Sequence, residues 1–284
     1  MVNIKLKRIQ RMIREKSLSE KDLLFILYTK IEDDGELINI QLFNQWIQNY
    51  YDYFGQLHKT ISFNNIEFRN FDLTSVDFRN VEFRKCSFIS CDFTDSNFLN
   101  AKFTDVHFWG IDVESTCFRG ANFTNTILDD VEPYGEVNFL ETKFTNCRIS
   151  FTKLDDSHLD FTNSIFQNTI FTMPTGNKND KIQIINPIGL GDGQILDDGG
   201  IMTFRIDYCY FENCRLVNLT ISFFYAQYSV FNNCDFINTN ITNTLNIKGA
   251  NINNVRINND FFQIFYQKAT IKECDECISI YNKF

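Results

Sequence analysis

The chain has 284 residues, with 36 Asp and Glu against 27 Lys and Arg and a net charge of −9 at pH 7. This balance disfavours a nucleic-acid binder, which is expected to be basic. No apolar run approaches the ~18 residues that span a membrane, and the basic, periodic start predicts no signal peptide. Nine cysteines, an odd number, favour reduced thiols and a cytoplasmic location.

Residues 1–57 are predicted to be a helical capping region. A first helix places apolar residues such as Ile9 on one face and basic residues on the other. We interpret the basic face as solvated, with an anionic membrane or a partner as the alternative. A second helix begins after Ser19, a candidate N-cap with Asp22 three residues later. A third is predicted over ELINIQLFNQWIQNYYDYF, from residue 36.

From residue 61 a large apolar residue returns at every fifth position, a period that fits neither a helix nor a strand. Eleven of the fourteen residues at these central positions are Phe. A second column, two residues earlier, holds small or medium residues, and the other three positions are mostly polar. The central positions are Phe63, Phe68, Leu73, Phe78, Phe83, Phe88, Phe93, Phe98, Phe103, Phe108, Val113, Phe118, Phe123 and Leu128.

This repeat predicts a square solenoid. Each unit of five points two side chains inward and three outward, so that four units close a coil of ~20 residues whose neighbours stack by parallel pairing ~4.8 Å apart. Phe83 is then expected between Phe63 and Phe103. About 32 units would make roughly eight coils and a rod of ~40 Å.

The spacing changes in places along the chain. One residue is extra before Phe139, and the series continues to a centre at Leu159 before it resets at Phe161. A loop interrupts the repeat at about 173–203, and the series resumes at Ile206. We therefore expect a repeat domain over 61–257.

The pattern A/C/S/T/V-(D/N)-(F/L)-x-x resembles that of the pentapeptide-repeat family. The resemblance covers most of residues 61–257 and implies a mainly β fold, a right-handed quadrilateral parallel β-helix. With the helices before it, the expected architecture is this solenoid with an N-terminal helical cap.

Acidic residues are the clearest functional signal. Asp72, Asp92 and Asp112 take the same outward slot at intervals of 20 residues, which predicts a vertical row of carboxylates. A surface charged only for solubility is the alternative. The same slot on neighbouring sides holds Glu67, Asp77 and Glu82.

Some members of the resembled family imitate a DNA duplex and bind type II topoisomerases such as DNA gyrase, giving quinolone or toxin protection. A non-enzymatic scaffold for an unidentified protein partner is the broader expectation, without direct nucleic-acid or membrane binding. No catalytic constellation, cofactor site or metal site is predicted. The interruption is a candidate binding loop, with Asn177, Lys178, Lys181, Asp192, Asp197 and Asp198 as its polar residues.

Residues 258–284 leave the repeat and are predicted to cap the last coil or to form a homodimer contact. Cys274 and Cys277 form a CxxC, but no second ligand pair follows it, so two free thiols are favoured over zinc.

Overall fold

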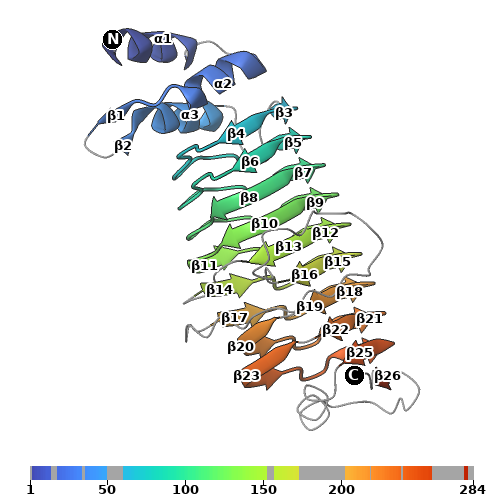
Figure 1. The fold of residues 1–284 in the computed structure, drawn as a ribbon. Helices are drawn as coiled ribbons and strands as arrows, with labels where there is room; N and C mark the ends of the chain where they lie inside the picture. The colour runs from blue at the N-terminus through green and yellow to red at the C-terminus, as the bar shows by residue number, and fades with distance from the viewer. Residues whose placement is uncertain are drawn as a thin grey trace, which may run out of the picture.

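A computed structural model shows a helical cap above a long β-solenoid (Figure 1). The mainly β, parallel architecture predicted from the repeat is confirmed, because the strands of the three larger sheets pair in parallel from one coil to the next. The structure describes residues 2–13, 18–33, 36–49, 60–151, 157–172, 202–217, 219–237, 239–257 and 278–280.

Two long sheets form adjacent sides of the solenoid, here called face 1 and face 2. In the described residues face 1 has nine strands and face 2 has ten. Face 1 comprises β3 (Ser62–Asn64), β5 (Glu82–Arg84), β7 (Lys102–Thr104), β9 (Asn122–Thr124), β12 (Lys143–Thr145), β15 (Ile165–Gln167), β18 (Tyr210–Glu212), β21 (Val230–Asn232) and β24 (Asn251–Asn253). Face 2 comprises β4 (Glu67–Arg69), β6 (Ser87–Ile89), β8 (His107–Asp112), β10 (Ile127–Glu132), β13 (Arg148–Phe151), β16 (Ile170–Thr172), β19 (Arg215–Val217), β22 (Asp235–Ile237), β25 (Val255–Ile257) and β26 (Ile278–Ile280).

The other two sides are less regular in the upper coils. Face 3 is joined there by single bridges that link Asp72 to Asp92 and Asp92 to Asp112. Face 4 begins with similar bridges and continues as a five-stranded sheet. Its strands are β11 (Gly135–Asn138), β14 (Ser157–Asp160), β17 (Met202–Arg205), β20 (Thr220–Tyr225) and β23 (Asn240–Asn246).

Stacked phenylalanine rings fill the interior. Phe83 lies between Phe63 and Phe103, with ring centroids 5.4 and 5.3 Å away and interplanar angles of 15° and 6°. All three side chains are fully buried. The predicted sandwich is therefore confirmed, and each residue has its ring partner one coil away.

Polar residues of the small inward column also form hydrogen bonds between coils. Ser96 Oγ donates to the Leu73 carbonyl oxygen (2.8 Å) and Thr116 Oγ1 to that of Phe93 (2.9 Å), each on the coil above. A hydroxyl can occupy the core because this bond satisfies it.

The corners explain the polar residues between the inward columns. At most corners the residue two after the central position has positive φ, as at Asn65 (57°) and Asn125 (50°). Asn, Asp and Gly tolerate this left-handed region best. Corner amides also bond between coils, since Asn125 Nδ2 donates to Asp105 Oδ1 (3.1 Å) and Asn146 Nδ2 to Asn125 Oδ1 (3.0 Å).

Two details of the predicted spacing are corrected. Leu159 is not a central residue, because it pairs with Val137 in the second inward column, and Phe161 lies under Phe139. After the interruption the strand begins at Met202, inside the range predicted for the loop, because Phe204 pairs with Leu159.

The cap consists of α1 (Val2–Ile13), α2 (Glu20–Tyr28) and α3 (Ile38–Gln48), with a short hairpin of β1 (Glu32–Asp33) and β2 (Glu36–Leu37). Ser19 caps α2 in a capping box with Asp22, as predicted. The third helix starts two residues later than predicted because Glu36 and Leu37 pair with the preceding strand.

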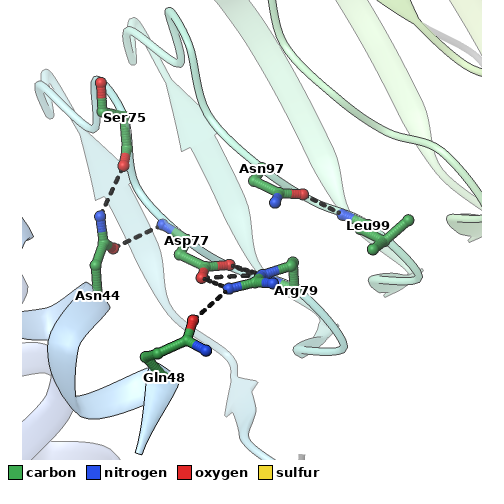
Figure 2. A network of polar contacts seen from close by, with 7 residues as sticks. All are labelled: Asn44, Gln48, Ser75, Asp77, Arg79, Asn97 and Leu99. Carbon is green, nitrogen blue, oxygen red and sulfur yellow. Dashed lines mark hydrogen bonds and ion pairs between the residues drawn. The ribbon is translucent and has the colours of Figure 1, made fainter. Parts of the chain in front are cut away.

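A side chain of the cap hydrogen-bonds to the first coil, where a preceding coil would otherwise supply the partner. On the second coil the Asn97 N–H donates to the Val76 carbonyl oxygen (2.9 Å). At Asp77, one coil higher, the corresponding N–H donates to Asn44 Oδ1 (2.7 Å), and Asn44 Nδ2 donates to the Ser75 oxygen (2.8 Å), as Figure 2 shows.

The Phe103 ring stacks on another ring on each side, so its removal is expected to leave a cavity in the core. Phe103→Ala should lower the free energy of unfolding by ~3–5 kcal/mol, measured by urea denaturation. The exposed neighbour Lys102→Ala is the control and should cost at most ~1 kcal/mol. Equal effects of the two changes would contradict the stacked core.

Asn44→Ala would leave the Asp77 N–H and the Ser75 oxygen without this partner. The expected loss is ~1–3 kcal/mol, seen as a lower unfolding midpoint. Gln45→Ala, an exposed change on the same helix, should stay within ~0.5 kcal/mol. An unchanged midpoint for Asn44→Ala would show that the amide is dispensable.

Candidate functional site

The carboxylates of face 3 stand in register. Asp72, Asp92 and Asp112 are bridged in sequence, and the β8–β10 pairing places Glu132 opposite Asp112. Parallel stacking spaces such residues ~4.8 Å apart. The structure thus brings together three of the six acidic residues singled out in the sequence and extends their row by one.

Local turns hold the upper carboxylates in place. Asp92 Oδ1 accepts the Thr94 N–H (2.8 Å), and Asp72 Oδ1 accepts the Thr74 N–H (3.3 Å). This two-residue reach is the usual Asx turn, in which the side chain replaces a backbone acceptor. The Asp at this slot therefore both starts the corner and points a carboxylate outward.

Face 3 is acidic throughout its upper four coils. Its spans are 70–75, 90–95, 110–115 and 130–135, and they contain no Lys or Arg. We call their carboxylates the acidic face. Its seven members are Asp72, Asp92, Asp95, Asp112, Glu114, Asp130 and Glu132.

A lysine of the cap approaches this face at its upper end. Lys30 Nζ lies 3.9 Å from Asp72 Oδ2, and both side chains are largely exposed. An exposed pair at this distance contributes little, ~0–1 kcal/mol, and is screened by salt.

The other three predicted acidic residues lie on different faces and are ion-paired. Glu67 Oε1 accepts from Arg69 (2.8 Å), and Glu82 Oε2 accepts from Arg84 (2.9 Å). Asp77 is bonded by Arg79. Each arginine follows its acid by two residues, which places both on the outer side of one strand. The predicted continuation of the acidic row onto the neighbouring sides is therefore neutralised by arginine.

These ion pairs change the pKa of the carboxyl groups. The hydrogen bond from Arg69 lowers the pKa of Glu67. Hydrogen bonds from Lys102 and then from Arg84 lower the pKa of Glu82. Both groups therefore stay ionised while their charge is matched locally.

Sequence reasoning missed Glu132, although it follows Asp112 by the same 20 residues. The extra residue before Phe139 hid it, because the register was taken to break after Leu128. The polar residues proposed for the binding loop, Asn177 to Asp198, lie outside the described residues, as do Cys274 and Cys277.

The described residues contain no group of three or more His, Cys, Asp or Glu placed to hold a metal ion. None of the helices within these residues has the length and apolarity to cross a bilayer.

The inward cysteines are hydrogen-bonded and shielded. Cys147 Sγ donates to the Phe123 oxygen (3.4 Å) and Cys86 Sγ to the Phe63 oxygen (3.3 Å), as the serines and threonines of this column do. Burial raises the pKa of both thiols, that of Cys147 to about 11.

The chain is similar to known proteins in sequence and in structure. Residues 61–133 match the family described as a pentapeptide repeat region. A trypsin-treated variant of QnrB1, a plasmid-mediated fluoroquinolone resistance protein, is 14% identical over 75% of this chain and 98% of its own, with a TM-score of 0.42. HetL, a pentapeptide repeat protein involved in heterocyst differentiation regulation from the cyanobacterium Nostoc sp. strain PCC 7120, is 12% identical over 69% and 88%, with a TM-score of 0.21. No curated protein matches the sequence.

The raised thiol pKa predicts that Cys147 reacts slowly with alkylating reagents. At pH 8 a group with a pKa of about 11 is ~0.1% thiolate, so iodoacetamide followed by peptide mapping should leave it unlabelled until urea is added. The folded state binds this proton more tightly than the unfolded state. Its contribution to stability is therefore present below pH ~9 and falls as the pH rises towards 11. Rapid labelling of native protein would contradict the burial.

Proposed function

Because residues 61–133 belong to the pentapeptide-repeat family, we propose that the protein is a non-enzymatic interaction scaffold whose acidic face binds a basic surface of a protein partner. The observation that carries the proposal is the lack of Lys and Arg in the four spans of face 3. A cytoplasmic location, expected from the thiols, stays a prediction.

Electrostatics supports this choice of face. Glu67, Asp77 and Glu82 present matched pairs, which a basic partner would have to break. Carboxylates in a single-sign row instead sum their fields, which steers an oppositely charged partner and speeds its association. The row sits on hydrogen-bonded strands and turns, so binding needs little ordering of the scaffold.

A duplex mimic that binds a type II topoisomerase is the second candidate, and the charge density favours it. Seven carboxylates over four coils, or ~19 Å, give one charge per ~2.7 Å. A DNA duplex carries one per ~1.7 Å of its axis. The two densities differ by less than twofold, so a surface that binds DNA phosphates meets a related pattern on face 3.

Neutral isosteres test the acidic face without breaking its turns. Asp92→Asn, Asp112→Asn and Glu114→Gln together remove three charges, and the Asn side chain at position 92 can still accept the hydrogen bond from the Thr94 N–H. The matched control is Glu67→Gln, Glu82→Gln and Glu141→Gln, which removes three charges from other faces. The readout is capture of proteins from an extract of the source cells, followed by mass spectrometry.

We expect the wild type and the control to capture the same basic-surfaced protein and the face 3 variant to lose it by at least tenfold. Capture that survives in the face 3 variant would exclude the acidic face. DNA supercoiling by purified gyrase, with and without a quinolone, separates the two candidates. No effect of the wild-type protein at micromolar concentration would exclude the gyrase-binding mimic and leave the scaffold.

A further inference from the structure

The exposed aromatic side chains of the upper coils lie at the acidic face. Within residues 60–151 the large hydrophobic side chains that are exposed are Trp109 (46%) and Tyr134 (53%). Trp109 directly precedes the face 3 span of the third coil, and Tyr134 lies inside the span of the fourth. Both rings therefore share one part of the surface with the carboxylates of the acidic face.

Trp109 stands beside carboxylates of the next coil. It lies on β8 with Ile89 opposite it on one side, and on the other side β10 places Asp129 opposite it (Figure 1). Asp130 follows at the corner to face 3. Asp129 already has a cation near it, since its Oδ1 lies 3.9 Å from Arg148 Nη2. Within the residues that the structure describes, no ring contact, hydrogen bond or ion pair involves the Trp109 ring or the Asp130 carboxylate.

The corner beside Trp109 carries no side chain. Gly110 fills it with a φ of 58°, whereas Ser90 (52°) and Asp130 (58°) hold the same corner in the coils above and below. A Cβ added at Gly110 would lie 3.7 Å from Asp130 Oδ2 and 3.9 Å from Ser90 Oγ, which are ordinary contact distances. The fold would therefore accept a side chain here, and the glycine instead leaves room beside the Trp109 ring and next to the Asp130 carboxylate.

Charge excludes two kinds of occupant for this surface. An apolar partner would bury Asp112 and Asp130 without a counter-charge, which is costly. A second copy of the chain would bring carboxylates against carboxylates, which is repulsive. A cation suits both features, because the face of an indole ring attracts positive charge and the carboxylates pair with it.

Shape then favours one cation over the other. The guanidinium group of arginine is planar and weakly hydrated, so it stacks on an aromatic ring while its N–H groups reach a carboxylate at the edge of that ring. The ammonium group of lysine is compact and strongly hydrated, so it gains less from the ring. A carboxylate surface without aromatic rings would not distinguish the two in this way.

We propose that Trp109, Gly110 and Asp130 form a binding site for an arginine side chain of the basic partner. The guanidinium group stacks on the indole ring and donates N–H groups to the Asp130 carboxylate. Tyr134 supplies a second exposed ring among the same carboxylates. This inference rests on the proposed function, because the acidic face attracts the partner, and it makes that face selective for arginine over lysine.

The chain contains two tryptophans, which makes the site observable. Trp46 is buried and Trp109 is exposed, so quenching of the fluorescence by acrylamide reports mainly on Trp109. The probes are two synthetic peptides of alternating residues, one of arginine and glycine and the other of lysine and glycine, with equal charge. Their affinities are measured by calorimetry at low salt.

We expect the wild type to bind the arginine peptide at least threefold more tightly than the lysine peptide, and the arginine peptide to protect Trp109 from acrylamide. Trp109→Leu should remove the preference by weakening the arginine peptide alone. Trp109→Tyr should restore part of it, because tyrosine also presents a ring face. The matched control Tyr208→Asn removes an exposed ring at the corner between faces 4 and 1 and should change neither affinity.

Equal affinities of the wild type for the two peptides, or no binding of either, would overturn the inference, and so would a preference that survives Trp109→Leu. The triple variant Asp92→Asn, Asp112→Asn and Glu114→Gln tests the proposed function separately. If it loses both peptides while Trp109→Leu changes neither affinity, the acidic face stands and the arginine site fails. If Trp109→Leu does not fold by circular dichroism, the wild-type quenching decides, and an unprotected Trp109 in the saturated arginine complex would overturn the inference.

Discussion

The contact between identical positions one coil apart controls the rest of this structure. Phe63, Phe83 and Phe103 stack with nearly parallel rings, and this fixes the register of the strands that carry them. Burial of each ring contributes ~1.5–3 kcal/mol, and offset stacking adds ~0.5–1.5 kcal/mol. Because inward residues are in register, outward residues are too. The carboxylate row of face 3 is a consequence of this alignment.

A repeat of this kind separates folding from function. Inward positions vary little because each must fit a neighbour, and corner positions favour residues that accept positive φ. Outward positions change coil by coil, and on face 3 in the upper coils they are rich in carboxylates. The same position in other coils serves as an internal reference, which shows that this surface is not required by the fold.

Much of this arrangement was predictable from the sequence. The five-residue period located the phenylalanine stacks, and Ser19 with Asp22 located the start of α2. Other features depend on contacts that one sequence does not display. The pairing of Glu67 with Arg69 was hidden because charges were counted along columns rather than across a strand. The start at Met202 was missed because Phe204 pairs across the interruption, and the extra residue near Phe139 concealed Glu132.

A double-mutant cycle on Phe83 and Phe103 tests the stacked register most directly. Phe83→Leu, Phe103→Leu and the double substitution are compared by urea unfolding. If the rings stack in adjacent coils, the two changes are coupled by ~0.5–1.5 kcal/mol. The pair Phe83 and Phe123, two coils apart, should be additive. Additivity of Phe83 and Phe103 would contradict the stacking on which the account depends.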